Sequence, residues 1–308
     1  MADSPNFLGF LGRWTAGLRE LWAAIGEYES FALAAAVTFI YFMVRPLGPW
    51  WAHVPAVLLA VAGLLVPKLG RRPGVWLILA VAVASWVIPA WTFMDNHGYL
   101  LVYWCLALFA SLAWSDHPAE TLATNARIMI GLVFGLAVLW KVVLSPDFMN
   151  GEFFRVVFLV DHRFRTFTEL AGGMTAKVAQ HNQQLIQQLR LGQLGLTSVK
   201  LTEPHAQVVL AYVTTWWTAL VETTVAVTFL IPRRFRLSKI RDAVLIFFCW
   251  FTYPFASVAG FGWLLTVMGV SQVEPERRIT RTFYLGTFAL ILIDKLVPWT
   301  QALVNLLH

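Results

Sequence analysis

The chain has 308 residues, of which 58% are hydrophobic and only 13% are charged. Soluble globular domains carry about 25% charged residues, so this composition excludes an ordinary soluble domain and predicts an integral membrane protein. The formal net charge is +6, but the basic residues are concentrated in the polar segments between apolar runs. That placement is typical of membrane orientation, so we expect the lipid bilayer as a partner and no nucleic acid.

The N-terminal segment, residues 1–28, has the pattern of an amphipathic helix. Large apolar side chains recur there at intervals of three or four residues: Phe7, Phe10, Leu11, Trp14, Leu18, Leu21, Trp22 and Ile25. We expect this helix to lie in the membrane surface, or alternatively to pack on a partner subunit. Acidic residues interrupt the segment, and the first long apolar run begins only at Phe31, so the pattern is not that of a signal peptide.

Eight apolar stretches follow and predict the fold class, an all-α integral membrane protein built as a polytopic bundle of about eight transmembrane helices. The stretches cover residues 31–44, 51–66, 75–93, 97–114, 125–144, 206–231, 240–270 and 279–298. The first five belong to a region 29–144 and the last three to a region 206–308. The seventh stretch is too long for one straight helix, and Pro254 with Gly260 and Gly262 would kink it or divide it into two pieces.

The basic loop residues favour an N-terminus in the cytoplasm. In that orientation the cytoplasmic side receives Arg13, Arg19, Lys68, Arg71, Arg72, Arg233, Arg234, Arg236, Lys239 and Arg241. The short connection at residues 94–96 has no Lys or Arg and falls outside, whereas Arg45, Arg277 and Arg278 are exceptions. With eight crossings, the C-terminus also lies in the cytoplasm.

The polar interval 145–205 is predicted to form a structured cap on the outer face. Residues 153–160 are an apolar run of eight, too short to cross a bilayer, so we expect a re-entrant or interfacial segment. Between residues 174 and 189, one side of a predicted helix is apolar and the other carries glutamines. An outer segment of this length is more often functional than a simple connector.

Lys141 and Glu222 are charged residues inside apolar stretches. Lys141 lies near the end of the fifth stretch, where its amine can extend to lipid headgroups, find a partner, or act as a base or anion-holder. Glu222 lies deep in the sixth stretch and is a candidate for a buried pair or a proton step.

Two histidines open predicted spans at the outer membrane level where Lys141 also lies, His97 before the fourth span and His205 before the sixth. Histidine titrates near neutral pH, so a proton-transfer site at this level is chemically reasonable. The alternative is that these side chains simply meet headgroups and water. The histidines come from separate elements without the ligand spacing of a metal site, and we therefore expect no metal.

Two short motifs resemble a known family. Residues 95–100, DNHGYL, resemble the Asn-His-x-Tyr-Leu motif of the vitamin K-dependent gamma-carboxylase family and its bacterial relatives, the horizontally transferred transmembrane (HTTM) domain proteins. About forty residues later, GLAVLWK at 135–141 followed by SPDFMNG at 145–151 resembles the next signature of that family. The interval between Lys141 and Gly151 is slightly longer than the family pattern.

The resemblance implies a stand-alone membrane enzyme of the bacterial inner (cytoplasmic) membrane with a reduced quinone, similar to vitamin K, as its lipid-soluble reactant. Lys141 then matches the base that deprotonates the quinol, and His97 matches a residue that stabilises the resulting anion. The further residues expected to line the quinol site are Asn96, Tyr99, Trp140, His205 and Glu222. The alternative is a non-catalytic transmembrane subunit of a larger bacterial membrane complex, with other membrane subunits as partners and Lys141 as an interfacial anchor.

Overall fold

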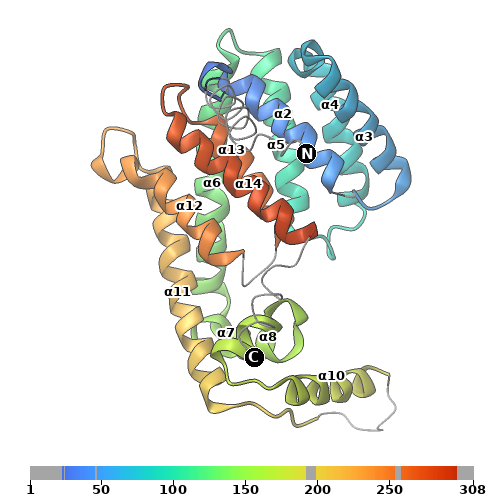
Figure 1. Cartoon of the computed structure of the whole chain (residues 1–308), viewed down its shortest axis with the longest axis vertical. Coiled ribbons are helices and arrows are strands. Elements are labelled where there is room, and N and C mark those ends of the chain that lie inside the picture. Colours follow the sequence, from blue (N-terminus) through green and yellow to red (C-terminus); the bar gives the residue numbers. More distant parts are fainter. Residues whose placement is uncertain (1–22, 24, 46, 192–198, 254–257, 297–308) are drawn as a thin grey trace, which may run out of the picture. The chain divides into compact units, whose positions relative to one another are not determined.

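A computed structural model describes residues 23, 25–45, 47–191, 199–253 and 258–296, and all regular structure in these ranges is helical (Figure 1). The predicted all-α class is therefore confirmed. The amphipathic helix predicted for the N-terminal segment falls almost entirely on residues outside the described ranges.

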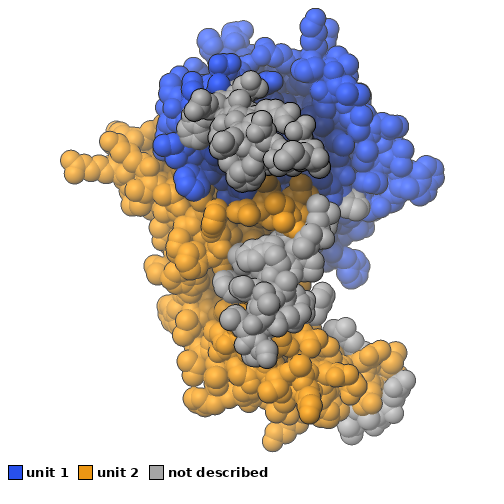
Figure 2. All heavy atoms as spheres, viewed as in Figure 1, with its two compact units in different colours: residues 1–127, 263–288 blue, residues 128–262, 289–308 orange. Residues whose placement is uncertain are grey.

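The chain divides into two compact units (Figure 2). Unit 1 comprises residues 1–127 and 263–288, and unit 2 comprises residues 128–262 and 289–308. Each unit therefore joins segments that are distant in sequence. Three helices contribute residues to both units: α6 (Pro118–Leu139), α13 (Ala259–Ser271) and α14 (Arg278–Leu296).

Unit 1 contains four consecutive apolar helices: α2 (Ser30–Val44), α3 (Trp50–Leu65), α4 (Pro73–Val87) and α5 (Asn96–Ala113). Three of them begin and end within one residue of the predicted stretches 31–44, 51–66 and 97–114. The third stretch was predicted to reach residue 93, but α4 ends at Val87. Pro89 explains the difference, since it has no N–H to continue the helical hydrogen bonds.

Two buried tryptophans in the interior of unit 1, Trp76 and Trp104, have ring N–H groups that are hydrogen-bonded. Trp76 stacks on Phe39 with ring centroids 4.7 Å apart, and its Nε1 donates to the Gly70 carbonyl at 2.8 Å. Trp104 Nε1 donates to Thr38 Oγ1 at 2.9 Å. Because buried donors without partners are costly, the Trp104 bond holds α5 against α2, while the Trp76 bond and its stacking on Phe39 hold α4 against the turn before it and against α2.

Arg281 of α14 connects the two sequence segments of unit 1, because it hydrogen-bonds both to residues just before α2 and to Val273. Its side chain is fully buried, and its guanidinium donates to backbone carbonyls and one hydroxyl rather than to a carboxylate. The acceptors are Ile25 O at 3.1 Å, Tyr28 O at 2.7 Å, Val273 O at 3.1 Å from Nη2 and 3.3 Å from Nε, and Ser30 Oγ at 2.5 Å. This fork of donors holds the entry to α2 against the turn between α13 and α14.

Unit 2 is built around α11 (His205–Leu230), with the later part of α6 and α12 (Arg241–Thr252) beside it (Figure 1). Two glycines on α6 face α11. A Cβ on Gly131 would lie 2.6 Å from the Leu230 side chain, and one on Gly135 would lie 3.9 Å from Ala226. Glycine therefore lets the two helices approach closely, as small residues do in membrane bundles.

The interval predicted to be an outer cap forms short helices: α7 (Pro146–Met149), α8 (Glu152–Val160), α9 (Arg165–Ala171) and α10 (Ala176–Arg190). A small aromatic core of Phe148, Phe154 and Phe158 packs on Ala211 of α11. The cap is tied to the chain before α11 by a bidentate pair from Arg155 to Glu203, at 3.1 and 2.7 Å. Hydrogen bonding to Glu203 raises the pKa of Arg155 above its usual value.

Gly151, between α7 and α8, gives a stability prediction. Its φ is +82°, and an added Cβ would lie 3.0 Å from the Tyr212 ring. We expect Gly151→Ala to lower the free energy of unfolding by about 1–2 kcal/mol, because L side chains disfavour this conformation. Thermal melting in detergent measures the loss. Gly74→Ala is the control, since no atom lies within 4 Å of its Cβ, and an equal effect at both positions would contradict the explanation.

Three helices are long and apolar enough to cross a membrane among the described residues: α5, α6 together with the turn that follows it to Leu144, and α11. Four shorter helices, α2, α3, α4 and α13, are also apolar. The seventh predicted stretch is two helices, α12 and α13, with Pro254 in the interval between them.

Candidate functional site

Lys141 lies in an irregular turn that directly follows the apolar helix α6. The α-helical pattern of α6 ends at Leu139, and residues Trp140–Leu144 form a π-helical turn, η2. Pro146 then occupies the first position of α7, where proline is tolerated because that N–H has no helical acceptor. Single π-turns within helices occur frequently at functional sites, and this one determines where the lysine side chain leaves the helix.

Glu222 of α11 is the partner of Lys141. Lys141 Nζ donates to Glu222 Oε1 at 2.5 Å, and the two side chains are 18% and 10% exposed. The amine also lies 5.3 Å from the centroid of the Phe148 ring, a distance at which an aromatic face attracts a cation. Of the alternatives open for Lys141, the structure therefore shows a partnered amine, and Glu222 forms the buried pair that its position suggested.

Glu222 Oε2 is buried without a hydrogen-bond partner among the described residues, and so is the hydroxyl of Tyr253. The Glu222 carboxylate is close enough to Tyr253 to interact with it electrostatically, yet the two groups do not hydrogen-bond. An unsatisfied buried polar group costs about 1–3 kcal/mol and often marks an ordered water or ligand. The site therefore offers one free acceptor and one free donor.

The Tyr253 ring is held by its apolar neighbours. It makes an edge contact with Phe248, centroids 6.2 Å apart, and a Cβ on Gly262 would lie 2.7 Å from the ring. Sequence reasoning missed Tyr253 altogether. The available signal was a phenol within an apolar stretch, since a buried tyrosine hydroxyl usually needs a partner.

The Lys141–Glu222 pair is suited to proton transfer. Burial penalises both charges, so the ion pair and its neutral tautomer, an amine beside a carboxylic acid, differ less in energy than they do in water. Hydrogen bonds in such a low-dielectric site are also stronger than in water. The pair can therefore accept or release one proton with little rearrangement of its side chains.

His97 contacts Arg45 and Asp95. It lies in unit 1, is 6% exposed, and hydrogen-bonds to Arg45, with Asp95 Oδ2 3.6 Å from its Nε2. Lys141 lies in unit 2. Lys141 is therefore paired with Glu222, and His97 is hydrogen-bonded to Arg45. The partnership of His97 with Lys141 stays a prediction.

The remaining residues predicted for the quinol site are spread over both units. In unit 1, Asn96 is exposed at the start of α5, and the Tyr99 hydroxyl donates to the Trp91 carbonyl at 2.8 Å. In unit 2, Trp140 is 51% exposed and His205 is exposed at the start of α11. Their predicted contacts with a quinol also stay predictions.

No three His, Cys, Asp or Glu side chains come together as a possible metal site within the described ranges. The Lys141–Glu222 pair has a buried carboxylate oxygen, Glu222 Oε2, without a hydrogen-bond partner among the described residues. Its two side chains can act together as an acid–base pair.

Comparison with known proteins adds no relative: no protein-family model, no curated protein and no solved structure matches this chain.

Proposed function

We propose that this chain is a polytopic enzyme of a bacterial cytoplasmic membrane, similar to the vitamin K-dependent gamma-carboxylase and HTTM proteins, with about eight crossings and a cytoplasmic N-terminus. Three helices of membrane-spanning length and composition support the location. So do large exposed apolar side chains along α6 and α11, including Leu136 at 62% and Leu220 at 63% exposure. Such surfaces are unfavourable in water and suit a lipid environment.

The observation that carries the catalytic part of the proposal is the Lys141–Glu222 pair with its free carboxylate oxygen. An ionisable pair at depth in apolar helices is expensive to maintain and is typical of proton-handling sites. Glu222 Oε1 holds the amine, which leaves Oε2 free to meet a hydroxyl proton.

In the proposed reaction the pair accepts the proton of a substrate hydroxyl. The substrate O–H bond breaks, its electron pair stays on oxygen, and a new O–H or N–H bond forms within the pair. Lys141 is then an ammonium and Glu222 a carboxylic acid, so the pair gains one positive charge beside the new oxyanion. Tyr253 has a free hydroxyl that can donate to the same oxyanion.

A lipid-soluble quinol is the substrate class that fits these features. Its hydroxyl is acidic enough for a desolvated amine–carboxylate base, and its apolar body reaches the site from the bilayer. The aromatic ring of Phe148 beside Lys141 suits a flat aromatic reactant. The motifs at 95–100 and 135–151 support the same class by resemblance.

Quinol turnover by the purified chain in lipid vesicles tests the proposal. Reduced menaquinone with oxygen and bicarbonate is the substrate mixture, and epoxide or quinone formation is followed by mass spectrometry. We expect Lys141→Ala and Glu222→Gln each to lower the rate by about 10²–10⁴-fold, the usual contribution of a positioned base. A small primary amine in solution should partly restore Lys141→Ala.

Two controls separate catalysis from stability. Lys177→Ala removes an exposed lysine from α10 and should leave the rate unchanged. Tyr253→Phe keeps the ion pair and should lower the rate by about tenfold, the value of one hydrogen bond to an anion. Equal rates for the chain and Lys141→Ala, or no turnover by either, would reject the enzyme and favour the non-catalytic subunit.

A further inference from the structure

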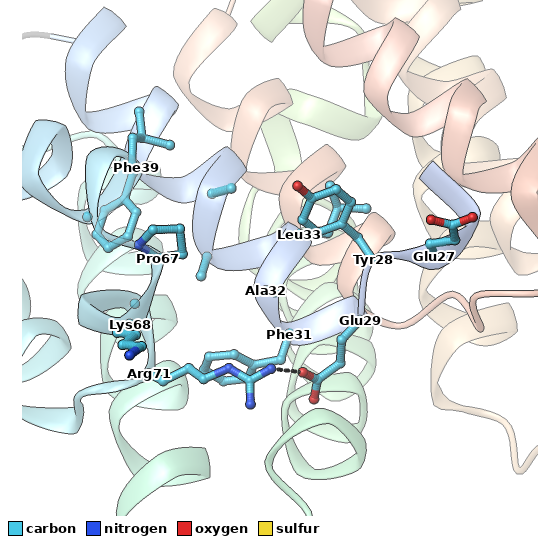
Figure 3. Close-up of a pocket in the computed structure, with 15 residues that line it drawn as sticks. Glu27, Tyr28, Glu29, Phe31, Ala32, Leu33, Phe39, Pro67, Lys68 and Arg71 are labelled. Carbon is cyan, nitrogen blue, oxygen red and sulfur yellow. Dashed lines mark hydrogen bonds and ion pairs between the residues drawn. The ribbon is translucent and has the colours of Figure 1, made fainter. Parts of the chain in front are cut away.

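Unit 1 contains a cavity that none of the predicted site residues lines. It has a volume of about 790 Å³ and lies between the first half of α2 and the 3₁₀ turn η1 (Pro67–Arg71) (Figure 3). Its walls are mostly apolar, with Phe31, Ala32, Ala36 and Phe39 from α2 and Leu64 from α3. This volume is within the usual range for a small-molecule site.

The walls of this cavity are rigid. Phe39 is stacked on Trp76, and Trp76 donates to the Gly70 carbonyl within η1. Gly63 lies so close to the Phe39 ring that no Cβ would fit between them. The volume of the cavity is therefore set by side chains that are held in one conformation.

Four charged residues line the cavity: Glu27, Glu29, Lys68 and Arg71. Figure 3 shows Arg71 reaching from η1 to Glu29, and its Nη2 donates to Glu29 Oε2 at 2.5 Å. Lys68 and Glu27 form no ion pair with another described residue. The lining thus offers an unpaired cation and an unpaired anion with no net charge, one side suited to a phosphate and the other to an amine.

We propose that this cavity binds one phospholipid with a zwitterionic amine headgroup, phosphatidylethanolamine. Lys68 and the free guanidinium nitrogens of Arg71 hold the phosphate, Glu29 and Glu27 accept from the primary ammonium, and one acyl chain lies along the apolar wall of α2. A lipid with net negative charge fits less well, because both carboxylates would repel it. A choline headgroup fits less well because it has no N–H to donate.

Native mass spectrometry of the full chain, released from nanodiscs that contain equal amounts of phosphatidylethanolamine, phosphatidylcholine and phosphatidylglycerol with identical acyl chains, tests this proposal. We expect one phosphatidylethanolamine to be retained per chain in preference to the other two. Lys68→Ala should lower that retention by about tenfold, the loss of one charge-assisted contact. Glu29→Gln, which leaves Arg71 unpaired, should shift the preference toward phosphatidylglycerol.

Two further variants distinguish a built site from ordinary bilayer lipid. Lys239→Ala removes an exposed lysine from a second 3₁₀ turn, Arg236–Ile240, and should leave retention unchanged. Ala36→Trp fills the apolar wall and should lower retention of all three lipids while the melting temperature stays the same. Equal retention of the three lipids by the unaltered chain, or equal effects of Lys68→Ala and Lys239→Ala, would overturn the proposal.

Discussion

Replacing Lys141 by Met is expected to lower the free energy of unfolding by about 3 kcal/mol, because it leaves the buried Glu222 carboxyl without its partner. Glu222→Leu should have a similar cost, since it strands the lysine amine. The double variant should recover most of the loss, as two apolar side chains of similar volume replace a buried ion pair at little net cost. Chemical denaturation in detergent micelles gives the four free energies of this double-mutant cycle.

The exposed pair Arg71–Glu29, whose side chains are 63% and 44% exposed, is the control. Its coupling energy should be at most about 1 kcal/mol, the usual upper value for an exposed ion pair. Coupling of similar size in both pairs would mean that Lys141 and Glu222 are fully solvated. The proposed acid–base site would then lose its physical basis.

Arg281→Met is expected to destabilise unit 1 by about 3 kcal/mol, since it leaves one buried acceptor and three part-buried acceptors without their donor, and an unsatisfied buried group costs about 1–3 kcal/mol. Arg281→Lys should be intermediate, because an ammonium lacks the planar fork that reaches acceptors on both sides. Hydrogen exchange followed by mass spectrometry should show faster exchange at residues 25–30 and near Val273, where the acceptors lie.

Arg72→Met is the control for this prediction, because Arg72 is an exposed arginine in the same unit. Exposed substitutions of this kind usually change stability by less than about 0.5 kcal/mol. Unchanged exchange at residues 25–30 in Arg281→Met would show that the entry to α2 is held by packing alone.

The positions of the helices were largely predictable because apolar runs longer than about fifteen residues have few alternatives to a helix. The helix ends were less predictable, because polar residues in a first turn or a nearby proline decide where a helix begins or stops. The start of α6 at Pro118 precedes the apolar stretch by seven residues, since its first two turns are polar and were not counted. From Pro254 the sequence predicted either a kink or a division in residues 240–270, and the structure has two helices, α12 and α13. A proline can either bend a helix or end it, and the sequence alone does not decide between the two.

The site was predictable in kind but not in its partners. A lysine and a carboxylate within apolar stretches each indicate that a counter-charge lies nearby. Lys141 and Glu222 are 81 positions apart, however, and a single sequence does not show which distant residues form a pair. Arg281 was missed although it lies within the eighth apolar stretch, where a charged side chain also needs a polar partner. Its partners are backbone carbonyls, and these leave no mark in a sequence.

The π-turn at Trp140–Leu144 has a consequence for how this protein can change over evolution. One additional residue in a helical turn rotates everything after it by about 100° about the axis. The direction of the lysine amine is thus set separately from the face of α6 that meets α11 through Gly131 and Gly135. Exposed residues earlier in α6 can therefore change in evolution without altering the direction in which the Lys141 side chain leaves the helix.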